Sequence, residues 1–155
     1  MKLEILLEKL KPETIVFIRS KKFKILEHIV WWQAKANENY DKYILQDEEG
    51  KKDYRLFISG DFLGFSTIFH YEFEEPMPKV LVYKGRKYNL VQDEFCVVKK
   101  TEGERVYKVG DAEIWWDYES ASDEGKGLSL GRNWNTWERE DLEVEEINRK
   151  DVSIK

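Results

Sequence analysis

Three side chains with clear acid–base or nucleophilic chemistry attract attention first. His28 and His70 lie far apart, and neither has a second histidine or cysteine at the spacing that zinc sites use. Cys96 lies in an alternating apolar run, where a small buried hydrophobe is more typical than a nucleophile. The sequence has no nucleophile elbow, phosphate-binding loop or dinucleotide fingerprint. We therefore expect no catalytic residue, no metal ligand and no cofactor.

A pair of carboxylates supports the main alternative, an enzyme. Asp117 and Glu119 are two positions apart in an expected strand, so their side chains point to the same face. Paired carboxylates carry out glycoside hydrolysis, in which one of them is the general acid. Because the chain contains 31 acidic residues, such pairs also arise by chance. A carboxylate-dependent hydrolase is thus the alternative to a non-catalytic protein.

A tryptophan-containing segment near the C-terminus is the candidate binding site. It combines large aromatic side chains with hydrogen-bonding groups, a mixture typical of protein interfaces. Gly125, Gly127 and Gly131 predict that the segment is a mobile loop. We predict a binding or scaffold module that contacts a protein partner through this loop. The residues expected to form the contact are Trp134, Trp137, Arg132, Asn133 and Asn135.

Charge is distributed unevenly along the chain. There are 26 basic and 31 acidic residues, a net charge of −5, whereas residues 111–155 alone carry 13 acids and 6 bases. Basic residues gather in two turns, at 19–24 and 84–87, which we expect to pair with the acidic C-terminal segment. A pI near 5.3 disfavours a dedicated nucleic-acid-binding protein. Weak binding of nucleic acid or phosphate through the basic turns is a further alternative.

The composition indicates a folded cytoplasmic protein. The chain has 155 residues, and Trp, Tyr and Phe together make up 14% of them, enough for a substantial core. A single cysteine fits a reducing compartment. No apolar run approaches the roughly 20 residues of a membrane span. The N-terminus also lacks the apolar stretch of a signal peptide. Any association with a membrane is therefore expected to be indirect.

The first twelve residues predict a short amphipathic helix. Leu3, Leu6, Leu7 and Leu10 recur at the spacing of one helix face, and Pro12 ends the pattern. A helix of this length is marginal alone, so we expect its leucine face to pack against the same domain.

From residue 14 onward, the pattern is that of strands and turns. β-branched and aromatic runs alternate with Gly, Asp and Asn. Beyond the first helix, we expect at most a helical turn near 141–147. Adjacent tryptophans at 31–32 and 115–116 point to opposite faces of their strands, so both faces must be covered. The expected strands include 15–18, 22–33, 42–46, 54–59, 65–73 and 112–118.

The strand pattern restarts after a segment that contains two prolines. Residues 15–26 match residues 80–91 class by class at an offset of 65, and residues 41–47 match residues 105–111 at an offset of 64. This predicts a tandem pseudo-repeat. The fold is thus expected to be mainly β, with two related antiparallel units in a barrel or sandwich after a short N-terminal α-helix. The expected parts of this one compact domain are the helix (1–12), the first unit (14–73), a linker (74–79), the second unit (80–147) and a polar tail (148–155).

Several short motifs also suggest a family. They are YRLF at 54–57, YKGRKY at 83–88, YKVGD at 107–111 and LS at 128–129. With the repeated strand pattern, the chain resembles the bacterial family known as domain of unknown function 4178 over about residues 14–147. Tyr40 and Lys42 stand where the family pattern has Trp and Glu. The resemblance implies a module without enzyme chemistry, linked to a membrane or envelope-stress system.

Overall fold

The computed structural model describes residues 3–72, 74–104 and 106–155. Met1, Lys2, Phe73 and Arg105, which fall within the predicted helix, first unit and repeat, lie outside the described residues. The chain begins with one short helix, α1 (Leu3–Lys9), and a 3₁₀ turn, η1 (Arg149–Asp151), lies near its end. The strands are β1 (Ile15–Ile18), β2 (Lys21–Gln33), β3 (Glu38–Asp47), β4 (Tyr54–Ser59), β5 (Phe62–Phe69), β6 (Val80–Tyr83), β7 (Arg86–Gly103), β8 (Ala112–Ser120), β9 (Lys126–Asn133), β10 (Arg139–Glu146) and β11 (Val152–Ile154).

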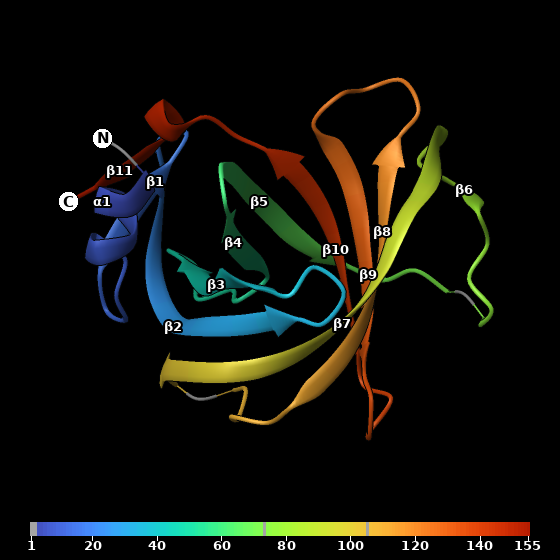
Figure 1. Ribbon diagram of the computed structural model, residues 1–155. Helices are drawn as coiled ribbons and strands as arrows, with labels where there is room; N and C mark the ends of the chain where they lie inside the picture. Colours follow the sequence, from blue (N-terminus) through green and yellow to red (C-terminus); the bar gives the residue numbers. More distant parts are fainter. Residues whose placement is uncertain (1–2, 73, 105) are drawn as a thin grey trace.

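Eight antiparallel strands close into a barrel. Their order is β2-β3-β4-β5-β10-β9-β8-β7, and pairing between β7 and β2 completes the circle. In Figure 1 these strands curve around a common centre, with α1, β1 and β11 together on one side and β6 on the opposite side. The predicted mainly β fold after a short helix is therefore confirmed, and its form is a closed barrel.

The barrel closes where β2 and β7 meet. Both strands are long, and a β-bulge between Val30 and Trp31 interrupts their pairing, which helps them to bend. Gly103, at the end of β7, has a φ of +111°, and a Cβ there would lie 2.1 Å from the carbonyl oxygen of Leu26. Only glycine allows the two backbones to approach this closely.

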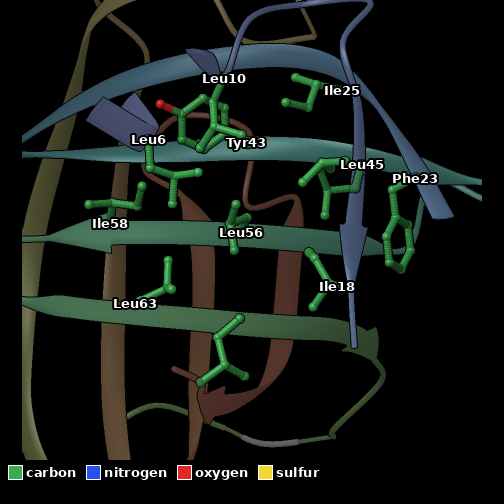
Figure 2. Packing of buried hydrophobic residues seen from close by; sticks show 12 residues of the cluster. Leu6, Leu10, Ile18, Phe23, Ile25, Tyr43, Leu45, Leu56, Ile58 and Leu63 are labelled. Atoms are coloured by element: carbon green, nitrogen blue, oxygen red, sulfur yellow. The ribbon is translucent and has the colours of Figure 1, made fainter. Parts of the chain in front are cut away.

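One outer face of the barrel is covered by α1, β1 and β11. Leu6 of α1 and Leu10, directly after the helix, are each 1% exposed, and they pack with Tyr43 and Ile58 from the strands beneath. Figure 2 shows these side chains converging in one cluster with residues of β1 and β2. The prediction that the leucine face of the helix packs on its own domain is confirmed.

The two neighbouring tryptophans of β8 belong to different hydrophobic clusters. One cluster lies inside the barrel, and the other covers a second part of its outer surface. Trp115 packs inside with Trp31 and Leu142. Trp116 packs outside with Leu81 of β6 and with residues of the segment that precedes it. Both side chains of the pair are buried, as predicted from their adjacency.

Two sequence-based expectations about the C-terminal third are wrong. The segment at 141–147 forms most of strand β10 rather than a helical turn, because Leu142 and Val144 alternate toward the interior between β5 and β9. Gly127 and Gly131 lie in strand β9 rather than in a mobile loop. Of the three glycines, only Gly125 lies in the turn before that strand.

Each half of the chain begins with a similar hairpin, but the two halves together form one barrel. Ile15 faces Lys24 across β1 and β2, and Val80 faces Asn89 across β6 and β7, which is the same register at an offset of 65. The second sequence match, at an offset of 64, has no structural counterpart, because residue 43 lies in β3 whereas residue 107 lies between β7 and β8. The tandem repeat stays a prediction. The pairings β2–β7 and β5–β10 join the halves edge to edge.

Candidate functional site

A cavity of about 780 Å³ opens at one end of the barrel interior. Its lining includes Ser59 and Phe62, which flank the turn between β4 and β5, and residues 121–125 of the turn between β8 and β9. Aromatic side chains form much of its wall, notably Tyr40, Phe57, Phe62 and Trp115. These residues occupy inward positions on their strands, where alternation brings every second side chain to the interior.

The opposite end of the interior is occupied by a cluster of ion pairs, which we call the floor cluster: Lys42, Arg55, Tyr107 and Glu140. The Lys42 ammonium, fully buried, lies 2.6 Å from Glu140 Oε2. Arg55 Nε donates to Glu140 Oε1 at 2.8 Å, and the Tyr107 hydroxyl donates to Glu140 Oε2. Burial alone would raise the pKa of Glu140, but the charges of Lys42 and Arg55 outweigh it and lower that pKa to about 2. The cluster is held in a fixed, ionised arrangement.

Two further buried glutamates flank the floor cluster. Glu27 accepts hydrogen bonds from the backbone N–H groups of Val106 and Tyr107, which ties the β7–β8 connection to β2. Glu113 is 6% exposed, and its Oε2 has no hydrogen-bond partner among the described residues. Burial raises the pKa of Glu113 to about 7, although the nearby charge of Lys42 acts to lower it. Glu113 is therefore the group of the interior that changes charge near neutral pH.

Two carboxylates lie in the cavity wall. Among the described residues, only neutral groups donate hydrogen bonds to them. Glu94 Oε1 accepts the backbone N–H of Lys35 at 2.7 Å. Asp117 accepts from the Ser129 hydroxyl at 2.7 Å and from the side-chain amide of Gln92 at 2.9 Å. Burial raises the pKa of Asp117, while these two hydrogen bonds lower it.

Cys96 also lines the cavity and is buried. Burial raises the pKa of its thiol to about 12, so the thiol stays protonated at neutral pH. The prediction of a small buried hydrophobe is confirmed.

The predicted binding loop lies outside the cavity, at the turn between β9 and β10. Trp134 and Trp137 are 49% and 62% exposed. Both rings lie against the guanidinium of Arg132, which itself forms an ion pair with Glu75 at 2.8 Å. The Asn133 side chain accepts two backbone N–H groups of its own turn. The structure therefore brings the predicted residues together, but it uses Arg132 and Asn133 to hold the turn.

The exposed Asn135 contributes its backbone N–H, which donates to the side chain of Asn133. The residue itself lies at the surface.

The carboxylate pair and the two histidines lie in different parts of the structure. Asp117 and Glu119 both line the cavity, as expected for side chains on one face of a strand. His28, part-buried, lies 2.7 Å from Asp41 and stacks on Tyr43. His70 lies after the end of β5 rather than in a strand. Hydrolysis by the carboxylate pair stays a prediction.

The basic turns pair with the acidic part of the chain, as predicted. Arg19 contacts Glu145, and Arg86 Nη2 lies 2.8 Å from Asp123 Oδ2. Both acidic partners belong to residues 111–155. Lys24, in contrast, pairs with Glu13, which lies outside that segment.

Comparison with known proteins gave no relative. No family model, curated protein or solved structure matches the chain. The resemblance to the domain of unknown function 4178 family therefore stays a prediction. Among the described residues, no group of three His, Cys, Asp or Glu side chains could hold a metal ion. No helix in that part of the chain has the length and apolarity to cross a membrane.

Sequence reasoning missed the charged interior. Lys42, Arg55 and Glu140 were not recognised as partners, and Glu94 was not singled out. One signal was available, since Lys42 alternates in phase with the aromatic Tyr40 and the apolar Ile44 along β3. A charge at an inward position of this kind calls for a buried partner.

Proposed function

We propose that this protein is a non-catalytic binding protein that holds a small molecule inside its β-barrel. The observation that carries the proposal is the cavity of about 780 Å³, whose wall combines aromatic rings with a few buried polar groups. Volumes of this size and walls of this mixture are typical of ligand pockets. Eight-stranded barrels leave space for one small ligand.

The floor cluster supports the cavity rather than acting as reacting groups. Lys42 is fully buried and held by Glu140 and Tyr107, and the rings of Trp115 and Phe57 lie 4.9 and 5.7 Å from its ammonium. Ion pairs with satisfied geometry hold side chains in place. The same rings form part of the cavity wall, so the cluster fixes the shape of the binding surface.

A cavity-filling variant tests the proposal. Val144 lines the cavity, whereas Val82 is 62% exposed on β6, so Val144→Phe and Val82→Phe add the same ring inside and outside the barrel. A library of neutral, anionic and cationic small molecules is screened by ligand-observed NMR. We expect at least one ligand to lose ten-fold or more in affinity with Val144→Phe and to bind normally to Val82→Phe. A library in which no binder is sensitive to Val144→Phe contradicts the proposal.

A protein contact through the β9–β10 turn is the second candidate function. It is favoured by the exposure of Trp134 and Trp137 together with their support by Arg132. Rigid aromatic side chains that are already ordered lose little entropy on binding. A pull-down from the native host compares wild type with the Trp134→Ala, Trp137→Ala double variant and with Val82→Ala, which truncates an exposed side chain on β6 away from the turn. Proteins captured by wild type and Val82→Ala but lost from the double variant support this candidate, and identical captures exclude it.

A further inference from the structure

The carboxylates of the barrel interior fall into two groups with different partners. At the floor, Glu140 is neutralised by Lys42 and Arg55 at 2.6 and 2.8 Å. In the cavity wall, Glu94 and Asp117 form no ion pair with any described residue. The carboxylate at one end of the interior is thus paired with cations, whereas the two carboxylates at the other end are not.

Glu94 is the clearest case. It lines the cavity, yet it is only 3% exposed. Its Oε1 accepts one backbone N–H, from Lys35, and within the described part of the chain its second oxygen accepts no hydrogen bond. A buried carboxylate in this position has remaining capacity for a positively charged donor.

Asp117 faces the same cavity from the neighbouring strand β8. Its two hydrogen bonds come from the neutral side chains of Ser129 and Gln92. Glu94 and Asp117 are close enough for the charge of Glu94 to raise the pKa of Asp117. A cation between them would remove this repulsion.

The other lining residues add to the negative potential. Besides Glu94 and Asp117, four acidic residues line the cavity, against one basic residue, Lys126, among the residues that the structure describes. One of the four, Asp123, pairs with Arg86. An anionic ligand would be repelled by this wall. Low-dielectric surroundings strengthen such effects inside a cavity.

The aromatic part of the wall is suited to an organic cation in particular. The rings of Trp115 and Phe57 already lie within reach of one cation, the Lys42 ammonium. Tyr40 and Phe62 extend the aromatic surface along the cavity. Aromatic faces attract ammonium groups and also cover the apolar body that carries them.

We propose that the ligand of the barrel is an organic cation, an ammonium group on an apolar or aromatic body, with its charge held by Glu94 and Asp117 and its body against Trp115, Phe57 and Tyr40. This inference rests on the proposed interior binding function and specifies its ligand class. The cavity volume of about 780 Å³ leaves room for a ligand of this kind.

Three soluble probes with a common benzyl body test the charge preference. They are benzyltrimethylammonium, benzyl alcohol and phenylmethanesulfonate, titrated against the full chain by ligand-observed NMR. We expect the cation to bind at least ten-fold more tightly than the other two. Its binding is expected to be lost in Val144→Phe and retained in Val82→Phe.

Conservative variants locate the charge. Glu94→Gln and Asp117→Asn keep the shape of the side chain and one acceptor oxygen but remove the charge. Each is expected to weaken benzyltrimethylammonium binding at least five-fold while benzyl alcohol binding changes less than two-fold. Glu143→Gln removes the same charge from the outer face of β10, where it pairs with Lys84, and is the matched control. Circular dichroism and melting curves establish that each variant is folded.

The outcomes separate the ligand class from the binding function. Equal or tighter binding of the alcohol or the sulfonate, unchanged cation affinity in both carboxylate variants, or no binding of the cation would each overturn the organic-cation proposal. If library ligands of another charge still depend on Val144, the interior binding function stands without it. If no ligand depends on Val144, both proposals fail.

Discussion

Lys42 Nζ lies 2.6 Å from Glu140 Oε2 inside the barrel, although the two residues are 98 positions apart. They come from β3 and β10, on opposite sides of the segment expected to be a linker. The pairing of β10 with β5 joins the two halves of the sheet, and the curvature of the closed barrel brings the two charges together in its interior. Arg55 shares the same carboxylate, so one anion serves two buried cations.

Removal of Lys42 should destabilise the protein. In Lys42→Met, Glu140 keeps Arg55 but loses half of its neutralising charge in a buried site, and we expect a loss of about 2–4 kcal/mol in the free energy of unfolding. Urea denaturation measures it. The double variant with Glu140→Gln should lose less than the sum of the single variants. Lys84→Met, at the exposed pair with Glu143, should change stability little. Wild-type stability in Lys42→Met would contradict this assignment.

Glu113 should make stability depend on pH. Burial raises its pKa from 4.5 to about 7, so between these values the folded protein binds a proton that the unfolded chain has released. Stability therefore falls as the pH rises through this window, and the full loss of stability is reached above pH 7. We expect the free energy of unfolding of Glu113→Gln to exceed that of the wild type by about 1–3 kcal/mol at pH 8 and by less at pH 5. A difference that is equal at both pH values in urea denaturation would show that Glu113 is not the titrating group.

Cys96 should be unreactive in the folded protein. Its thiol is buried and its pKa is raised to about 12, so little thiolate is present at pH 8. We expect labelling by a thiol-specific disulfide reagent only after addition of denaturant, with an unfolded sample as the reference for full reaction. Rapid stoichiometric labelling of the native protein would contradict the buried position.

Gly131 should be intolerant of even one added methyl group. A Cβ at this position would lie 2.5 Å from the ring of Trp115, which packs directly on the strand. We expect Gly131→Ala to cost about 1–3 kcal/mol by overpacking and to shift the tryptophan fluorescence. Asn135→Ala, in the exposed turn that follows β9, is the control and should leave both unchanged. An unaltered spectrum and stability would mean that Trp115 does not rest against Gly131.

Local patterns predicted the N-terminal part of the fold well. The strand at 54–59 was predicted with the bounds that the structure shows, and the leucine spacing predicted the packed helix. The strands β9 and β10 were missed for a physical reason. Glycines at 127 and 131 resemble loop residues, yet they relieve close contacts with Tyr118 and Trp115. In β10, the many acidic residues around Leu142 and Val144 made the alternation of these two apolar residues difficult to detect.

The interior site could be predicted only in part. Asp117 was singled out with Glu119 as a carboxylate pair on one face of a strand, and the structure places both in the cavity wall. The surroundings of Asp117 depend on Ser129 and Gln92, which come from two other strands and reach it only through the barrel register. Single-strand patterns contain no information about which strands become neighbours when a sheet closes.

Intermolecular NOEs test the central claim most directly. The tightest ligand found by the NMR library screen is added to protein with labelled valine methyl groups and tryptophan rings. Binding inside the barrel predicts NOEs from ligand protons to the methyl groups of Val144 and to the ring of Trp115, both of which line the cavity. NOEs confined to surface residues such as Val82 on β6 or Trp137 in the β9–β10 turn, with none to Val144 or Trp115, would contradict it.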